Sequence, residues 1–197
     1  MKKILLLILF IIFTLTSINA QKKILIGVKG GVNIININSD NYFMDSNSKT
    51  GFYLGLLSEI PFGDIFSIQP EILYSSQGSK ANLLLIGGGP WVGDYSLKYI
   101  QAPILAKIYI FNKISVEIGP SFNFLVDGKE KINSISRNDL GKTFEFSGAL
   151  GVSYKLKERF SINTRYVHGL SAAFDRGGNY SEDAKNSGFQ FGVGFIF

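Results

Sequence analysis

Residues 188–197 read Gly-Phe-Gln-Phe-Gly-Val-Gly-Phe-Ile-Phe, and most of them alternate between an apolar side chain and a small or polar one. The apolar phase consists of Phe189, Phe191, Val193, Phe195 and Phe197. A period of two places successive side chains on opposite faces of a β-strand. This stretch is therefore predicted to be a strand with one aromatic face and one glycine-rich face.

Seven further segments repeat this alternation. They cover roughly residues 24–35, 51–60, 65–74, 97–110, 114–124, 144–154 and 159–168. A tilted strand of about ten residues is long enough to cross a bilayer. The repetition predicts an all-β protein with eight strands, each able to span a membrane.

The connections between these segments alternate between long and short. The long ones cover residues 36–50, 75–96, 126–143 and 169–187, and the short ones cover residues 61–64, 111–113 and 155–158. Transmembrane barrels combine long loops on one side with tight turns on the periplasmic side. We predict an eight-stranded antiparallel up-and-down transmembrane β-barrel with both termini in the periplasm. Its even strand number allows the first and last strands to close the barrel as an antiparallel pair.

A soluble barrel or sandwich is the competing fold. There the apolar phase would form a core and the polar phase would face water. The polar phases of the eight segments hold few charged residues among many Gly and Ser: Lys29, Glu59, Glu71, Lys107, Glu117, Glu145 and Arg165. These charges are sparse for a solvated surface but sufficient for the interior of a small barrel, which its own side chains fill.

The first 20 residues have the composition of a cleavable signal peptide. Lys2 and Lys3 precede an apolar run over residues 4–13, and Ala20 suits the position before cleavage. An uncleaved anchor is the alternative, but the apolar run is shorter than a spanning helix requires. We predict a signal peptide over residues 1–20 and an outer-membrane barrel domain over residues 21–197.

Charge and cysteine content exclude several classes of function. Without the two signal-peptide lysines, the 20 basic residues fall to 18 against 15 acidic ones, and they form no dense patch. Nucleic acid is therefore not an expected partner. The chain has no cysteine and a single histidine, which removes thiol catalysis, thiolate metal sites and multi-histidine metal sites.

The clearest site prediction concerns charges inside the barrel. If the 111–113 turn closes a hairpin, Lys107 lies directly opposite Glu117, and such facing pairs stabilise a sheet. We predict an interior polar network formed by five residues: Lys29, Glu71, Lys107, Glu117 and Arg165. A network of this kind would plug the lumen and argue against a diffusive pore. In a soluble fold the same charges would point to water.

Prolines within the predicted strands are expected to disturb them. Pro70, Pro103 and Pro120 each lack the N–H that a sheet ladder requires. A closed barrel has no edge strand to accommodate them. We expect β-bulges or a local loss of pairing at these positions.

Candidates for chemistry are few. His168 falls in the outward phase of its segment together with Tyr166, where it is expected at the membrane interface rather than in a catalytic group. Gly141-Lys142-Thr143 resembles the tail of a phosphate-binding loop, but Ser136 stands where that motif needs glycine. We predict no catalytic residues, no metal and no cofactor, with a lipid-modifying enzyme as the minority hypothesis.

Two aromatic residues are candidates for contacts outside the barrel. Trp91 follows three glycines and Pro90 in a long connection, where it could anchor a binding partner or dip into lipid headgroups. Phe197 resembles the C-terminal aromatic residue by which the outer-membrane assembly machinery recognises barrels. We name both as candidate contact residues.

Several motifs together resemble the PorT-like outer-membrane β-barrel family. They are Gly-Val-Lys-Gly-Gly-Val-Asn at 27–33, Gln-Pro-Glu-Ile-Leu-Tyr-Ser-Ser-Gln-Gly at 69–78, Tyr-Ile-Gln-Ala-Pro-Ile-Leu-Ala-Lys at 99–107, Gly-Pro at 119–120 and Arg-Tyr-Val-His-Gly-Leu at 165–170. The resemblance implies an eight-stranded barrel in the outer membrane. Gln101 departs from it, because the family pattern has Glu there. The founding member is tied to protein secretion, a role that fold resemblance alone does not transfer.

The function predicted from these observations is that of a small outer-membrane barrel without catalytic activity. It would be structural, present extracellular loops to a partner, or do both. The alternative is a component of a protein secretion or uptake assembly. The expected partners are outer-membrane lipids, the outer-membrane assembly machinery and a protein that binds the long loops.

Overall fold

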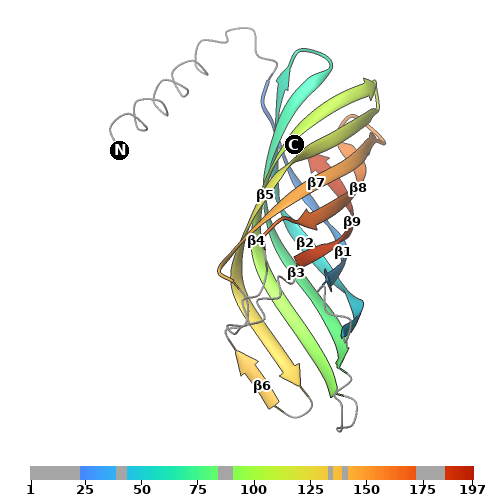
Figure 1. Ribbon diagram of the computed structural model, residues 1–197. Helices are drawn as coiled ribbons and strands as arrows, with labels where there is room; N and C mark the ends of the chain where they lie inside the picture. Colours follow the sequence, from blue (N-terminus) through green and yellow to red (C-terminus); the bar gives the residue numbers. More distant parts are fainter. Residues whose placement is uncertain (1–22, 39–43, 84–90, 133–134, 139–141, 172–184) are drawn as a thin grey trace, which may run out of the picture.

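The computed structural model describes residues 23–38, 44–83, 91–132, 135–138, 142–171 and 185–197 (Figure 1). The elements are β1 (Leu25–Asn38), β2 (Met44–Phe62), β3 (Phe66–Leu83), β4 (Trp91–Phe111), β5 (Ile114–Ile132), β6 (Ile135–Asn138), β7 (Phe144–Lys155), β8 (Phe160–Gly169) and β9 (Lys185–Ile196). Within these ranges, no helix has the length and apolar character needed to cross a membrane. The predicted signal peptide lies outside the described residues.

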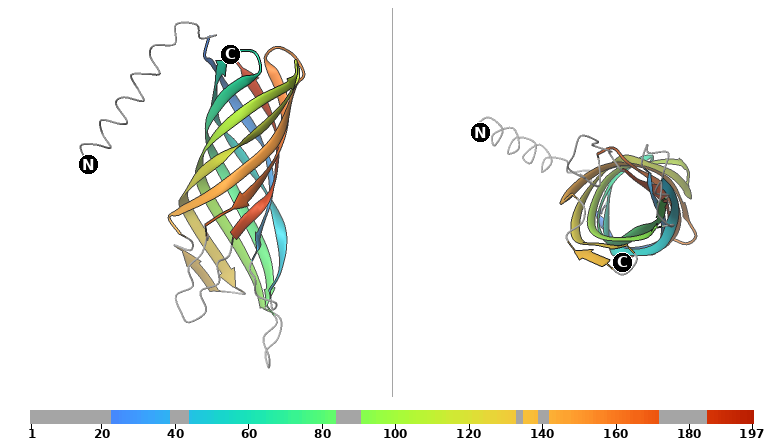
Figure 2. Two further views of the ribbon diagram at one scale, coloured as in Figure 1. Left: turned by 45° about the horizontal axis from the view of Figure 1, so that its top comes forward. Right: turned by 60° about the horizontal axis from the view of Figure 1, so that its bottom comes forward.

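Eight of the strands form a closed antiparallel barrel. Their order around the ring is β1-β2-β3-β4-β5-β7-β8-β9, and β1 pairs with β9 from Gly27↔Ile196 to Asn38↔Lys185. Figure 2 shows the closed ring from the side and from one end. The short β6 pairs with the loop end of β5 and adds no strand to the ring. The predicted eight-stranded up-and-down barrel is confirmed.

The barrel is apolar outside and polar inside. On β2 and β3, Leu56 and Ile72 of the apolar phase are 57% and 62% exposed, whereas Glu71 of the polar phase is 3% exposed. A soluble barrel would bury the apolar side chains and expose the charged ones. An apolar outer wall around a polar interior is the arrangement of a barrel that crosses a bilayer. This finding excludes the competing soluble fold.

Three tight turns join strands at the end of the barrel where both described termini lie (Figure 1). They fall between β2 and β3, between β4 and β5, and between β7 and β8, where short connections were predicted. In the first of them Gly63 has a φ of 83°, a left-handed conformation that a residue without a Cβ adopts at little cost.

The strands extend further at the other end than the sequence pattern indicates. β2, β3, β4 and β5 have 19, 18, 21 and 19 residues, and they include much of the predicted long loops. Figure 1 shows these strands projecting past β7, β8 and β9. The prediction ended each strand where apolar alternation ends. Backbone groups continue to pair beyond that point, for example at Ser76↔Lys98.

The prolines interrupt pairing without shifting the register. Between β2 and β3 the pairing stops after Leu57↔Glu71, next to Pro70. It starts again at Ile60↔Ile68 in the same register. Similar lapses occur near Pro103 and Pro120, where the missing N–H removes a ladder bond. The register shifts lie elsewhere, for example between Lys98 and Tyr99. Of the two expected disturbances, local loss of pairing is the one that occurs at the prolines.

A charge placed on the outer wall tests whether that wall meets lipid. Leu56 lies on the outer face between Phe52 and Phe62 of β2, whereas Leu156 is the same residue type and similarly exposed but lies in a turn. We expect Leu56→Arg to lower the free energy of unfolding by about 2–4 kcal/mol in lipid vesicles, and Leu156→Arg by at most about 1 kcal/mol. Urea titration of refolded protein measures both values. Equal losses for the two variants would contradict a lipid-facing wall.

Candidate functional site

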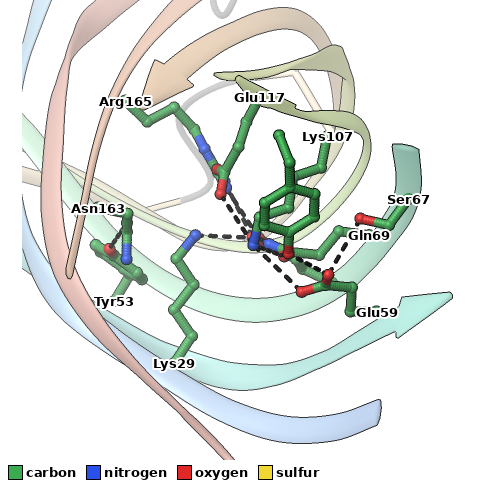
Figure 3. Close-up of polar contacts among 11 residues, drawn as sticks. Lys29, Tyr53, Glu59, Ser67, Gln69, Lys107, Glu117, Asn163 and Arg165 are labelled. Atoms are coloured by element: carbon green, nitrogen blue, oxygen red, sulfur yellow. Dashed lines mark hydrogen bonds and ion pairs between the residues drawn. The ribbon is translucent and has the colours of Figure 1, made fainter. Parts of the chain in front are cut away.

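Six charged side chains from six strands meet inside the barrel. The cations are Lys29 of β1, Lys107 of β4 and Arg165 of β8; the carboxylates are Glu59 of β2, Glu71 of β3 and Glu117 of β5. None of the six is more than 4% exposed. Figure 3 shows five of them pointing into the lumen from different strands. We refer to these six residues as the charge cluster.

The pair at the centre of the cluster crosses the barrel. Arg165 Nη1 donates to Glu71 Oε2 at 3.0 Å, and Arg165 Nη2 donates to Glu71 Oε1 at 2.8 Å. β3 and β8 are four strands apart around the ring in either direction, so they lie on opposite walls. Two parallel bonds from one guanidinium make a strong and directional ion pair. This pair therefore spans the diameter of the lumen.

Glu71 and Arg165 each bind further partners. Glu71 also accepts hydrogen bonds from Lys29 Nζ at 3.0 Å and from Gln69 Nε2 at 2.6 Å. Arg165 Nη2 also donates to Glu117 Oε2 at 2.9 Å. The central pair is thereby tied to β1 and β5 as well as to β3 and β8.

Lys107 joins the remaining carboxylates. The sheet register places it directly opposite Glu117, as the turn length predicts, and its Nζ lies 3.7 Å from Glu117 Oε1. The same ammonium donates to Gln69 Oε1 at 3.0 Å and to Glu59 Oε2 at 3.3 Å. The structure thus brings all five predicted network residues together.

Glu59 and Gln69 are members of the network that the sequence prediction left out. Glu59 accepts hydrogen bonds from Ser67 Oγ at 3.2 Å and from the Tyr109 hydroxyl. Its polar phase on β2 marked it as inward-facing, but its position near the predicted turn separated it from the other charges. Gln69 is uncharged, and only its place two residues before Glu71 on the same face could have identified it.

The charges of the cluster balance, with three cations and three carboxylates. Each carboxylate has a cation within 3.3 Å: Lys107 for Glu59, Lys29 or Arg165 for Glu71, and Arg165 for Glu117. A buried charge is tolerated only when it is paired and hydrogen-bonded, because transfer from water is otherwise very costly. Every charge of the cluster is paired in this way, and the buried Arg165 Nε is left without a hydrogen-bond partner among the described residues.

Toward the loop end, amides and hydroxyls replace most of the charges. Gln190 of β9 donates to Asn33 Oδ1 at 3.0 Å and to Gln101 Oε1 at 3.3 Å. Because β9 and β4 lie on opposite walls, the contact with Gln101 also crosses the lumen. Gln101 thus meets another neutral amide here. Asn186 of β9 makes a second crossing contact, to the Tyr99 hydroxyl at 3.3 Å.

The remaining sequence candidates lie away from the cluster. His168 is on the outer face, where its ring stacks on Tyr166 with a centroid distance of 6.3 Å, so it does not meet the interior carboxylates. The backbone of Trp91 pairs with Leu83, and its side chain is outside the described part. Phe197 is 67% exposed, and its backbone N–H donates to the Ile26 carbonyl at 2.9 Å. Among the described residues, no group of three or more His, Cys, Asp or Glu is arranged to hold a metal ion.

Comparison with known families agrees with this architecture. A family model described as "Outer membrane protein beta-barrel domain" matches residues 19–175, well over half of the chain. The chain belongs to this outer-membrane barrel family. The apolar wall of this family member accordingly lies in the outer membrane, in contact with lipid.

Solved structures of other outer-membrane proteins resemble this family member. Ail of Yersinia pestis, solved in complex with the heparin analogue sucrose octasulfate, has a TM-score of 0.56 at 16% identity, covering 89% of this chain and 100% of Ail. Neisserial surface protein A has a TM-score of 0.59 at 12% identity, with the same coverage. OprG of Pseudomonas aeruginosa has a TM-score of 0.50 at 13% identity, covering 90% of this chain and 97% of OprG. At such identities the likeness shows the fold alone. No curated protein matches the chain.

Replacing the central carboxylate of Glu71 tests whether the buried charges of the cluster depend on one another for stability. Glu71→Gln keeps the size of the side chain but leaves Lys29 without its ion-pair partner and Arg165 with Glu117 alone. We expect the free energy of unfolding to fall by about 3–5 kcal/mol, because the change leaves buried charge uncompensated. Glu158→Gln, at an exposed turn position, is the matched control and should change it by less than about 0.5 kcal/mol. Equal stability of the two variants in vesicles would contradict the cluster.

Proposed function

We propose that this protein is a closed outer-membrane barrel without catalytic activity that presents its loop end to a partner outside the cell. The observation that carries the proposal is the ion pair between Glu71 and Arg165, which bridges opposite walls of the lumen. A solute passing through the barrel would have to break this pair and expose both charges.

The space around the cluster supports a closed interior. The cavity beside it measures about 20 Å³ and is lined by residues that include Lys29, Glu59 and Lys107. A volume of this size holds about one water molecule. Eight-stranded barrels are narrow enough for side chains to fill them, whereas wide channels need sixteen or more strands.

The loop end supports a role in contacts. β2 to β5 project past the rest of the barrel, so this end extends the sheet beyond the lipid-covered wall (Figure 1). Trp91 begins β4 at the far end of this projection and remains our candidate for an anchor residue. Binding residues are disproportionately found on loops that a rigid scaffold positions.

Targeting and orientation complete the proposal. The signal peptide over residues 1–20 would direct the chain out of the cytoplasm, and Phe197 would be the residue that the outer-membrane assembly machinery recognises. The short turns and both termini would face the periplasm, in keeping with the usual barrel arrangement. The loop end would then face the outside of the cell.

A component of a protein secretion or uptake assembly is the alternative. The PorT-like resemblance of segments such as 69–78 and 99–107 favours it. A lipid-modifying enzyme has less support. His168 lies on the opposite side of the wall from the interior carboxylates, so it cannot form a catalytic group with them.

Conductance across a planar bilayer tests the closed barrel. We expect the folded wild-type protein to give no sustained channel current, because the crossing ion pair blocks the lumen. Glu71→Ala/Arg165→Ala shortens both side chains and serves as the comparison, and heat-dependent gel mobility shows whether each protein is folded. A stable, voltage-independent current from the wild-type protein would contradict the proposal.

A further inference from the structure

The outer face of the barrel changes character along β3, β4 and β5. One row across these strands is aromatic and aliphatic, with Tyr74, Ile100 and Phe124 in register. The next row on the same outer face, two residues closer to the loop end, contains Ser76, Lys98 and Asp127. Two residues along a strand cover about 7 Å, so the lipid-compatible wall gives way to charge within one step.

Four lysines lie on the outer face beyond that boundary, and the side chain of a fifth reaches the same face at Asp94: they are Lys80, Lys98, Lys129 and Lys131, with Lys49 as the fifth. We call these residues the lysine face. Only two aspartates, Asp94 and Asp127, accompany them among the side chains described on this part of the sheet. The lysine face therefore carries more positive charge than its own carboxylates neutralise.

Ion pairs hold three of the five lysines in place without burying them. Lys49 Nζ lies 2.8 Å from Asp94 Oδ1, and Lys98 Nζ lies 2.8 Å from Asp127 Oδ2. Lys129 Nζ shares the latter oxygen at 3.6 Å. These side chains remain between 32% and 58% exposed. Each ammonium thus keeps donors that are accessible from outside.

The middle of the lysine face contains the smallest side chains. Gly78 pairs with Ser96, and Ser96 pairs with Lys129. A Cβ on Gly78 would lie 3.1 Å from Lys49 Cδ, so the Lys49 stem runs across this glycine on its way to Asp94. Small side chains thus lie between the lysines at this part of the lysine face.

We propose that the lysine face binds phosphate groups of lipid headgroups in the leaflet that the loops face. Two observations select lipid as the occupant: the face continues the lipid-covered wall directly, and its excess positive charge complements phosphate. Aromatic residues mark the interface of a bilayer, and basic residues just beyond it attract anionic headgroups. The proposal rests on the orientation given above, with the loop end outside the cell.

Lipid binding by the folded, mature barrel tests this assignment. Native mass spectrometry of the protein in detergent measures retention of diphosphoryl lipid A, with phosphatidylcholine as the comparison lipid. Lys49→Gln/Lys98→Gln/Lys129→Gln removes three charges from the lysine face. Lys23→Gln/Lys113→Gln/Lys157→Gln removes three exposed charges from the short-turn end and is the matched control.

We expect the lysine-face variant to bind lipid A about 10- to 100-fold more weakly than the wild type, and the control variant to bind like the wild type. Heat-dependent gel mobility establishes that each variant is folded. Equal losses in the two variants, or equal binding of lipid A and phosphatidylcholine by the wild type, would overturn the proposal. Neither result would bear on the closed lumen, which the conductance experiment measures separately.

Thiol labelling of intact cells tests whether the lysine face lies on the outer side of the membrane. The chain has no cysteine, so Lys98→Cys carries a single thiol that a membrane-impermeant maleimide can label. Labelling in intact cells is the expected result. Labelling only after permeabilisation would overturn the orientation, and with it the assignment of the lysine face to the outer leaflet.

Discussion

The ion pair between Glu71 and Arg165 is the interaction on which the interior of this barrel depends. It joins opposite walls, and its two members contact Lys29, Gln69 and Glu117. Inside a wall covered by lipid, these charges have few alternatives to one another. Losing one partner of a buried pair costs about 3–5 kcal/mol, even where the intact pair adds little compared with apolar packing. Each member of the pair therefore depends on the other, because either charge left alone would be buried without its main partner.

The same period-two pattern accounts for both surfaces of the wall. Leu56 and Ile72 face outward into lipid. Glu71 precedes Ile72 in β3, and it faces inward because successive side chains of a strand point to opposite sides. In hydrocarbon, every backbone N–H and C=O must be paired, and closure of β1 on β9 leaves no unpaired edge in the ring. The prolines are tolerated as local lapses in an otherwise continuous ladder.

Local contacts could be predicted from the sequence, and contacts across the lumen could not. The pairing of Lys107 with Glu117 follows from the length of one turn, since only ten residues separate them. Glu71 and Arg165 are 94 residues apart. The alternation of apolar and polar residues shows that both side chains face the lumen. Their relative positions along the barrel axis depend on the stagger of the strands around the ring. The five network residues were identified by face and approximate depth, whereas Gln69 and Glu59 became evident only from the assembled barrel.

The projecting strands were underestimated for a related reason. Outside the lipid, side chains no longer need to alternate between apolar and polar, so Ser76 to Leu83 reads as a loop although its backbone pairs with β4. The charged lysine face arises where this polar extension leaves the apolar wall. The molecule therefore has three zones along its axis: a charge cluster, a layer of amides and hydroxyls, and an extension with a basic outer face.

A double-mutant cycle on Glu71→Gln and Arg165→Gln, with unfolding measured in lipid vesicles, tests the central claim most directly. Two residues in one hydrogen-bonded network should show a stabilising coupling of about 0.5–3 kcal/mol. A coupling in that range would show that opposite walls of the barrel are energetically linked through this pair. Strict additivity of the two substitutions would contradict the account.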